Sequence, residues 1–304
     1  MHVFVTGASG WIGSAVVPEL LSAGHEVTGL ARSEESAAAL AAAGAKVQRG
    51  SLDDLGVLAS AASQSDGVVH LAFKHDLAFS GDVDGALDAN RRAIDAFGEV
   101  LAGSNRPLVV ASGVFGLAPG RVATEQDGRD RVPASVGGLA TRLRAEQAAL
   151  AFSSNGVRSS AVRIAPTCHG EGDNGFMAFL VNIARATGVS GYLGDGDNRW
   201  PAVHRLDTAL LFRLALEKAP AGSAPHAVGE EGVPIRAVAE AIGRRLDLPV
   251  SAIPPEDAAN HFGFLAHLLG VDSPASSTIT QAQLNWRPTH PGLIADLEAG
   301  FYFK

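Results

Sequence analysis

Three glycines near the start of the chain, Gly7, Gly10 and Gly13, have the spacing of a turn that binds a pyrophosphate. The β-branched run before them predicts a buried strand, and residues 14–23 have helical periodicity. Such a turn presents the free N–H groups of a helix N-terminus to an anion. Gly7 can form the tight turn, Gly10 admits the phosphate, and Gly13 lets the helix pack on the strand. Close packing of the helix on the strand can also explain such a triplet, so the surrounding sequence must decide between packing and phosphate binding.

Arg32 follows the strand expected at 25–31. An acidic residue at this point would bind the adenosine ribose of NAD, whereas an arginine accommodates the 2′-phosphate of NADP. A solvated residue at the end of a strand is the alternative interpretation of Arg32. Ser33 is counted with the cofactor contacts and is also the expected N-cap of a helix that ends near residue 43. The sequence therefore favours NADP as the cofactor.

Lys74 and His75 follow the strand expected at 67–73. They would emerge at the carboxyl edge of a parallel sheet, where open α/β folds bind ligands. Two titratable groups at that edge are candidates for catalysis. Loop residues are also commonly just exposed, and this alternative stays open for both.

The elements that must position these residues alternate between strand and helix. Further strands are expected at 45–49, 107–111 and 162–170, and further helices at 82–102, 137–154, 176–187, 206–218, 235–246 and 261–269. This order predicts an α/β fold with a Rossmann-type, doubly wound parallel sheet. We expect a dinucleotide-binding domain at 1–170. Residues 171–304 should form mainly a smaller α/β substrate lobe with segments returning to the first domain, and a ligand cleft should lie between the two parts.

Composition argues against several other functions. The chain of 304 residues is 46% hydrophobic and carries a net charge of −8, whereas a nucleic-acid partner would require clustered Lys and Arg. The single cysteine, Cys168, excludes an intrachain disulfide and a Cys-rich metal site. The sequence shows neither an apolar run of about eighteen residues nor a signal peptide. We therefore expect no membrane segment and a cytoplasmic location.

The first half of the chain resembles the extended short-chain dehydrogenase/reductase family of NAD(P)-dependent epimerases, dehydratases and reductases, through the string Thr6-Gly7-Ala8-Ser9-Gly10-Trp11-Ile12-Gly13. Most two-domain dehydrogenases instead have Gly-x-Gly-x-x-Gly. The resemblance implies further cofactor contacts in the glycine turn, beside the adenine, beneath the dinucleotide and beside the nicotinamide. The residues at these positions are Ser9, Trp11, Ile12, Leu52, Asp53, Leu71, Ala72, Phe73 and Pro166. An N-cap role explains Asp53 about as well.

The family's Tyr-x-x-x-Lys pair is absent. Gly138 stands at the position of the tyrosine and Arg142 at the position of the lysine. Arg142 can still donate hydrogen bonds to the nicotinamide ribose, but its guanidinium stays charged and cannot act as a base. The resemblance is therefore to an atypical branch of the family, which retains the nucleotide fold and lacks the usual proton donor.

The resemblance also implies two catalytic positions at the ends of later strands. Ser112 matches the Ser or Thr that hydrogen-bonds the reacting carbonyl, although a turn cap would also explain a hydroxyl there. His169 stands where a tyrosine usually points at the substrate pocket, and Asn90 stands where an Asn holds a water of the proton relay. A histidine titrates near neutral pH, so His169 or His75 is the expected proton donor. A hydrogen-bonded structural histidine is the alternative for His169.

Two functions remain open. We expect an NADP(H)-dependent reductase or dehydrogenase of a small carbonyl or hydroxyl compound. The alternative is a non-catalytic NADP(H)-binding sensor, which the missing tyrosine favours. A sugar-nucleotide epimerase would need that tyrosine in both half-reactions. Relatives often dimerise through the helices that correspond to 82–102 and 137–154, so a homodimer is a further expectation.

Overall fold

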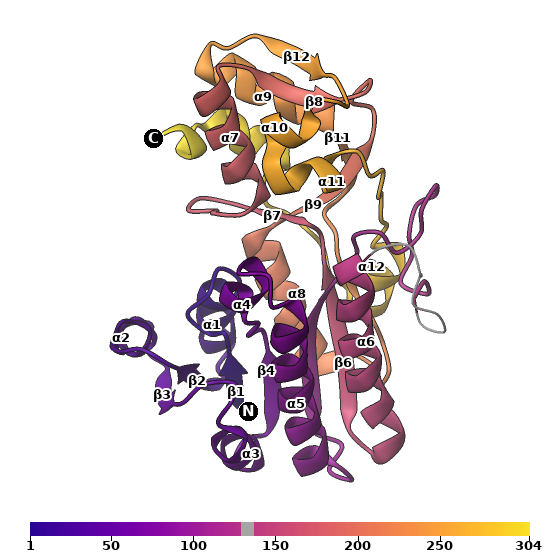
Figure 1. The fold of residues 1–304 in the computed structure, drawn as a ribbon. Helices are drawn as coiled ribbons and strands as arrows, with labels where there is room; N and C mark the ends of the chain where they lie inside the picture. Colours follow the sequence, from indigo (N-terminus) through magenta and orange to yellow (C-terminus); the bar gives the residue numbers. More distant parts are fainter. Residues whose placement is uncertain (129–136) are drawn as a thin grey trace.

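The computed structural model describes residues 1–128 and 137–304, apart from the side chains of residue 79 and residues 137–142. Two lobes are visible in Figure 1. The first is a parallel sheet covered by helices on both faces, and the second is a smaller group of helices and short strands at the carboxyl edge of that sheet (Figure 1). The α/β fold class expected from the sequence is confirmed.

The central sheet of the described residues has seven parallel strands in the order β3-β2-β1-β4-β5-β6-β10. The direction of winding reverses between β1 and β4, and open α/β sheets bind ligands at the carboxyl ends of such a strand pair. The strands are β1 (His2–Thr6), β2 (Glu26–Ala31), β3 (Lys46–Arg49), β4 (Gly67–His70), β5 (Pro107–Gly113), β6 (Arg158–Ile164) and β10 (His226–Ala227).

Helices cover both faces of this sheet through separate apolar clusters. One cluster contains Val16, Leu20 and Phe212 on the face of α1 (Gly13–Ser22), α2 (Glu34–Ala42) and α8 (Arg205–Lys218). The other contains Leu58 and Phe97 on the face of α3 (Leu55–Ser63), α5 (Val83–Leu101) and α6 (Gly137–Ala151), which the 3₁₀ turn η1 (Phe152–Asn155) extends. The short α4 (His75–Phe79) follows β4, and α12 (Thr278–Leu284) packs on α8.

The second lobe is built on its own apolar cluster, which includes Trp200, Phe262 and Leu297. Its strands are β7 (Thr167–His169), β9 (Arg199–His204) and β11 (Glu230–Pro234) in one sheet, and β8 (Ser190–Leu193) and β12 (Val250–Ile253) in another. Its helical elements are α7 (Phe176–Thr187), α9 (Ile235–Leu246), α10 (Ala258–Phe262), η2 (Gly263–Leu265), α11 (Ala266–Leu269), α13 (Leu293–Ala299) and η3 (Phe301–Phe303). Of the helices described, none is long and apolar enough to cross a membrane.

Most of the expected elements lie within a few residues of the observed ones, and three differ in extent or in how they are divided. The strand expected at 67–73 ends at His70. The strand expected at 162–170 is two strands, because β6 stays in the central sheet while β7 pairs with β9 in the second lobe. The helix expected at 261–269 is broken into α10, η2 and α11, because Gly263 has a φ of +56°, which a regular right-handed helix cannot contain.

Candidate functional site

In the glycine turn between β1 and α1, Gly7 and Gly13 are tightly packed and Gly10 is exposed. Gly7 has a φ of +65°, and a Cβ there would lie 2.7 Å from the amide nitrogen of Ala72. A Cβ on Gly13 would collide with the carbonyl oxygen of Gly7, whereas one on Gly10 would meet only that oxygen, at 3.2 Å. Ser9 and Gly10 are exposed at the rim of the turn.

The amides of this turn are available to an anion. Within the described part of the chain, the N–H groups of Trp11 and Ile12 have no acceptor, and α1 has no side-chain N-cap. Unpaired N–H groups and an open surface above Gly10 are the features that a pyrophosphate requires. The residues present therefore fit the phosphate groups of a dinucleotide.

Trp11 links this turn to the second lobe. Its Nε1 donates a hydrogen bond to the carbonyl oxygen of Cys168 at 2.9 Å. The guanidinium of Arg205 lies 4.2 Å from the centre of the indole ring, within the range of a cation–π contact. The turn and the segment that follows β6 are thus held together.

The residues expected beneath the dinucleotide lie at the switch point between β1 and β4. Leu71, Ala72 and Phe73 are half-buried. The amide of Leu71 donates to the carbonyl oxygen of Thr6 at 3.2 Å, and the amide of Ala72 donates to Oγ1 of Thr6 at 3.3 Å. This segment therefore forms the wall that Gly7 approaches.

A buried hydrogen-bond chain fixes the same wall. Nε2 of His70 lies 3.1 Å from Oδ1 of Asn90 and its Nδ1 lies 2.6 Å from Oγ1 of Thr6. The amide oxygen of Asn90 can only accept, so Nε2 carries the proton and the Thr6 hydroxyl donates to Nδ1. Burial lowers the pKa of His70 to about 4, so the imidazole is neutral at physiological pH. His70 lies in a strand that the sequence predicts, but no motif in the sequence indicated its role.

Arg32 and Ser33 both have partners at the end of β2. Arg32 is exposed, and its Nη1 lies 3.2 Å from Oδ2 of Asp76. Ser33 is the N-cap of α2, as expected, and its hydroxyl accepts the amide of Ser36 at 3.1 Å. The hydroxyl of Ser33 therefore caps α2, and its backbone adjoins Arg32.

Lys74 contacts the segment after β3. Its Nζ lies 2.6 Å from Oδ2 of Asp53, and Leu52 beside Asp53 is buried in the core on the α3 and α5 face. The N-cap residue of α3 is Asp54, so the alternative N-cap role of Asp53 is wrong, and the side chain of Asp54 makes no cap hydrogen bond. His75 is exposed, and its ring lies 5.0 Å from that of Phe73.

Ser112 and Pro166 lie on the other side of β4. Ser112 is near the carboxyl end of β5 and is only 4% exposed. Its hydroxyl has no hydrogen-bond partner among the described residues. Pro166 is half-buried between β6 and β7. Gly138 and Arg142 lie four positions apart on α6, but the side chain of Arg142 is outside the described part of the structure.

His169 is fully buried between the lobes. Its Nδ1 donates to Oδ2 of Asp296 on α13 at 2.6 Å, and its Nε2 has no partner in the described residues. Nε2 of His204 lies 3.8 Å from the same carboxylate. Nearby, the hydroxyl of Tyr302 donates to Asp173 at 2.7 Å, and burial raises the pKa of both groups.

Among the candidate catalytic residues, Lys74 and Ser112 lie on different sides of the switch point. Lys74 reaches toward the ends of β2 and β3, where an adenosine would lie in this fold, while Ser112 is on β5 at the opposite side of the switch point. The chain order alone could not show this division, because it does not tell in which direction the Lys74 side chain extends.

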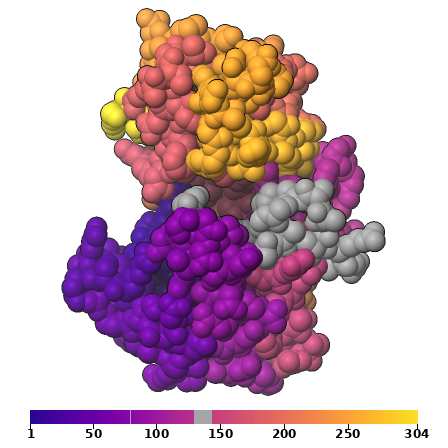
Figure 2. Space-filling view, viewed as in Figure 1, coloured from indigo at the N-terminus to yellow at the C-terminus, as the bar shows by residue number. Residues whose placement is uncertain are grey.

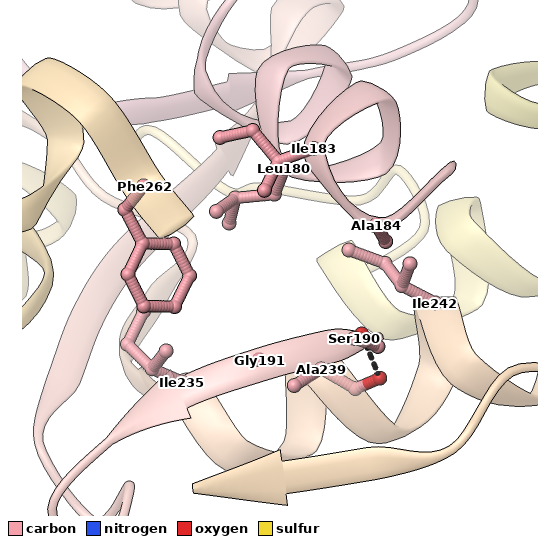
Figure 3. Close-up of a pocket in the computed structure, with 9 residues that line it drawn as sticks. All are labelled: Leu180, Ile183, Ala184, Ser190, Gly191, Ile235, Ala239, Ile242 and Phe262. Carbon is pink, nitrogen blue, oxygen red and sulfur yellow. Dashed lines mark hydrogen bonds between the residues drawn. The ribbon is translucent and has the colours of Figure 1, made fainter. Parts of the chain in front are cut away.

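A small apolar cavity lies in the second lobe and is shown in Figure 3. It lies between α7, β8 and α9, with Phe262 at one side, and Ser190 on its wall donates to the carbonyl oxygen of Ala239 at 2.7 Å. Its volume of about 10 Å³ is close to the minimum that holds one water molecule. It is too small for a substrate. In Figure 2 the orange and yellow atoms of this lobe lie directly above the indigo and purple atoms of the first. The cleft expected between the lobes stays a prediction.

Comparison with known proteins identifies relatives over the whole chain. The model of the NAD dependent epimerase/dehydratase family matches residues 3–228. An uncharacterized protein of Schizosaccharomyces pombe is 48% identical over 306 residues, which cover 100% of both chains. The 4-hydroxy-2-methyl-3-oxo-4-farnesyl-3,4-dihydroquinoline-1-oxide ketoreductase of Stigmatella aurantiaca is 28% identical over 73% of this chain and 66% of that enzyme.

A solved structure shares the fold. The dTDP-glucose 4,6-dehydratase DesIV of Streptomyces venezuelae, with NAD and TYD bound, superposes with a TM-score of 0.77 over 99% of this chain and 96% of its own, at 20% identity. That likeness shows the fold alone. Together with the match to the family model, it confirms the resemblance expected from the glycine string.

Proposed function

As this chain belongs to the NAD dependent epimerase/dehydratase family, we propose that it is an NADP(H)-dependent reductase or dehydrogenase of a small carbonyl or hydroxyl compound. Membership supports a nicotinamide dinucleotide cofactor and an enzyme of the oxidoreductase or epimerase type. The proposal goes further in naming NADP and in assigning the reaction to residues other than the family's tyrosine and lysine.

The hydroxyl of Ser112, which has no partner among the described residues, carries this proposal. A buried hydroxyl without a partner costs about 1–3 kcal/mol, so such groups usually have a ligand or water to bind. Ser112 is buried near the carboxyl end of β5, next to the switch point. A substrate carbonyl oxygen in this crevice would accept a hydrogen bond from Oγ and be polarised for reduction.

The cofactor assignment rests on the turn and on Arg32. The amides of Trp11 and Ile12 would bind the pyrophosphate, and the Arg32 guanidinium would bind the 2′-phosphate with charge-assisted hydrogen bonds. A bound NADPH would supply the hydride. Arg142 on α6 would donate to the nicotinamide ribose in place of the lysine.

We propose that His169, rather than His75, is the proton donor. Asp296 accepts a hydrogen bond from Nδ1 of His169 and leaves Nε2 buried with no partner among the described residues, so the ring is oriented as in other carboxylate–histidine pairs. His75 is exposed and follows Lys74, which faces Asp53. To act as the acid, His169 would have to be the imidazolium, with a proton on each ring nitrogen. It would deliver the Nε2 proton to the developing alkoxide directly or through one water, and would remain as the neutral ring whose Nδ1–H stays bonded to Asp296 until solvent returns a proton to Nε2.

The test is NADPH oxidation with a panel of small carbonyl compounds. Ser112→Ala and His169→Ala should each lower kcat by at least about tenfold and leave the Kd for NADPH within about twofold. His75→Ala should have a smaller effect. Ser160→Ala is a matched control, since Ser160 on β6 has a buried hydroxyl that also lacks a described partner.

Tight NADPH binding without turnover of any compound would contradict the enzyme proposal. That result would support the sensor, the alternative that the missing tyrosine favours. A homodimer through α5 and α6 also stays a proposal, and sedimentation of the purified protein would test it.

A further inference from the structure

Two ion pairs connect the segment after β4 to the ends of β2 and β3. Lys74 reaches Asp53 at 2.6 Å, and Asp76 reaches Arg32 at 3.2 Å. In the sheet order, β1 separates β4 from β2 and β3, so both pairs cross the carboxyl edge above β1. A dinucleotide on the glycine turn would place its adenosine on this side of the switch point.

We propose that this segment, residues 74–76, sets the preference between NADP and NAD: Lys74 is a second ligand of the 2′-phosphate, and Asp76 is a built-in competitor for Arg32. The inference rests on the cofactor site proposed above. It adds residues that follow β4 to a specificity that sequence position assigns to the end of β2 alone.

The chemistry of the two pairs fits an exchange. Arg32 and Asp76 have side chains that are 70% and 60% exposed, and exposed pairs contribute little stability and separate easily. A phosphate monoester carries nearly two charges and three acceptor oxygens, so it outcompetes a single carboxylate for a guanidinium. NADP would therefore displace Asp76 from Arg32, whereas NAD has no group to do so.

Lys74 can leave Asp53 without leaving a carboxylate unpaired. Nη2 of Arg92 on α5 already lies 3.8 Å from Oδ1 of Asp53 and can take over its charge. Lys74 is only 20% exposed and its backbone is fixed, because its carbonyl oxygen accepts the amide of Ala78 in α4. Its ammonium therefore lies at the carboxyl edge of the sheet, beside Asp53.

Two variants with opposite expected effects test the inference. Asp76→Asn removes the competitor and should tighten NADPH binding by about threefold to tenfold, while the Kd for NADH changes by less than about twofold. Lys74→Met keeps the length of the side chain and should weaken NADPH binding by about the same factor without weakening NADH. Both Kd values are measured by calorimetry at one fixed ionic strength, since the effect is electrostatic.

Glu26→Gln is the matched control. It removes an exposed ion pair with Lys46 that also joins β2 to β3, and its side chain is 69% exposed. It should change neither Kd. An Asp76→Asn variant with unchanged NADPH affinity, or one that binds both nucleotides more tightly by the same factor, would overturn the competitor role.

Arg32→Ala separates this inference from the proposed function. If Arg32→Ala loses the preference for NADPH while the Asp76 and Lys74 variants have the same ratio of the two Kd values as the native protein, the cofactor proposal stands and the role of segment 74–76 falls. If the native protein shows no preference for NADPH, both fall together.

Discussion

The indole Nε1 of Trp11 donates to the carbonyl oxygen of Cys168 at 2.9 Å, across 157 residues of chain. This bond joins the glycine turn to β7, the first strand of the second lobe. Arg205, the first residue of α8, packs over the face of the same ring. Trp11 is thus a contact through which the position of the second lobe and the shape of the turn depend on each other.

Trp11→Phe should weaken nucleotide binding by about threefold to tenfold. The phenyl ring keeps part of the contact with Arg205 but loses the hydrogen bond, which is worth about 0.5–1.5 kcal/mol. Calorimetry with NADPH measures the effect. Trp286→Phe is the control, because Trp286 also donates one hydrogen bond, to Asp207, away from the turn. It should lower stability and leave the Kd unchanged.

Gly10→Val should abolish nucleotide binding in a protein that still folds. A Cβ at Gly10 meets only the carbonyl oxygen of Gly7, at 3.2 Å, so the fold tolerates it, but the branched side chain fills the space expected for the pyrophosphate. Gly56→Ala on α3 has no atom within 4 Å of the new Cβ and should bind normally. Wild-type affinity in the Val variant would make the turn a packing device only.

Local patterns predicted most of the fold. The bounds expected for α7 and α9 are the observed ones, because each is a run of helical periodicity with its own apolar face. Gly263 shows where such reasoning fails, since one left-handed residue inside an apolar segment broke an expected helix. The separation of β7 from β6 depends on pairing with β9, which no local pattern contains.

The candidate site was predictable only where it is local. The glycine turn is one short stretch, and its crowding follows from residue type. The partner of His169 is Asp296, 127 residues away, and Arg32 finds Asp76 at a separation of 44 residues. Nothing in the sequence around these residues indicates either contact. Local patterns place charged and titratable residues at the carboxyl edge of the sheet but do not show which of them contact each other.

The protein should lose stability in mild acid, partly through His70. Burial lowers its pKa to about 4, whereas an unfolded histidine titrates near 6.5. Between these values the unfolded chain binds a proton that the folded chain does not, so the free energy of unfolding falls as pH drops from about 6.5 to 4. Above about 6.5 this contribution is constant. The full loss from His70 is of the order of 3 kcal/mol.

Urea denaturation at pH 7.5 and pH 5 measures this effect. His70→Gln should reduce the difference between the two pH values, whatever its effect at pH 7.5. His226, whose pKa burial lowers to about 3, leaves part of the dependence in place. His267→Gln changes an exposed residue of α11 and should leave the dependence as it is. An unchanged pH dependence in His70→Gln would contradict the neutral, buried state of His70.

The last prediction concerns the residues that replace the family's catalytic pair. Gly138 and Arg142 are one helical turn apart on α6, as tyrosine and lysine are in Tyr-x-x-x-Lys. Gly138→Tyr adds a phenol, but Arg142 remains a planar cation that cannot release a proton and has a different shape from lysine. The single variant should therefore change NADPH oxidation by no more than about twofold.

Gly138→Tyr with Arg142→Lys restores both groups, and a positioned acid contributes about 10²–10⁴-fold, so we expect a gain of at least tenfold on a compound that the native protein reduces slowly. Arg142→Lys alone is the control. A single variant as fast as the double one, with both at least tenfold above the native protein, would show that Arg142 already does what the lysine does, and the proton would then have no need of His169. A double variant no faster than the native protein would contradict the expected gain.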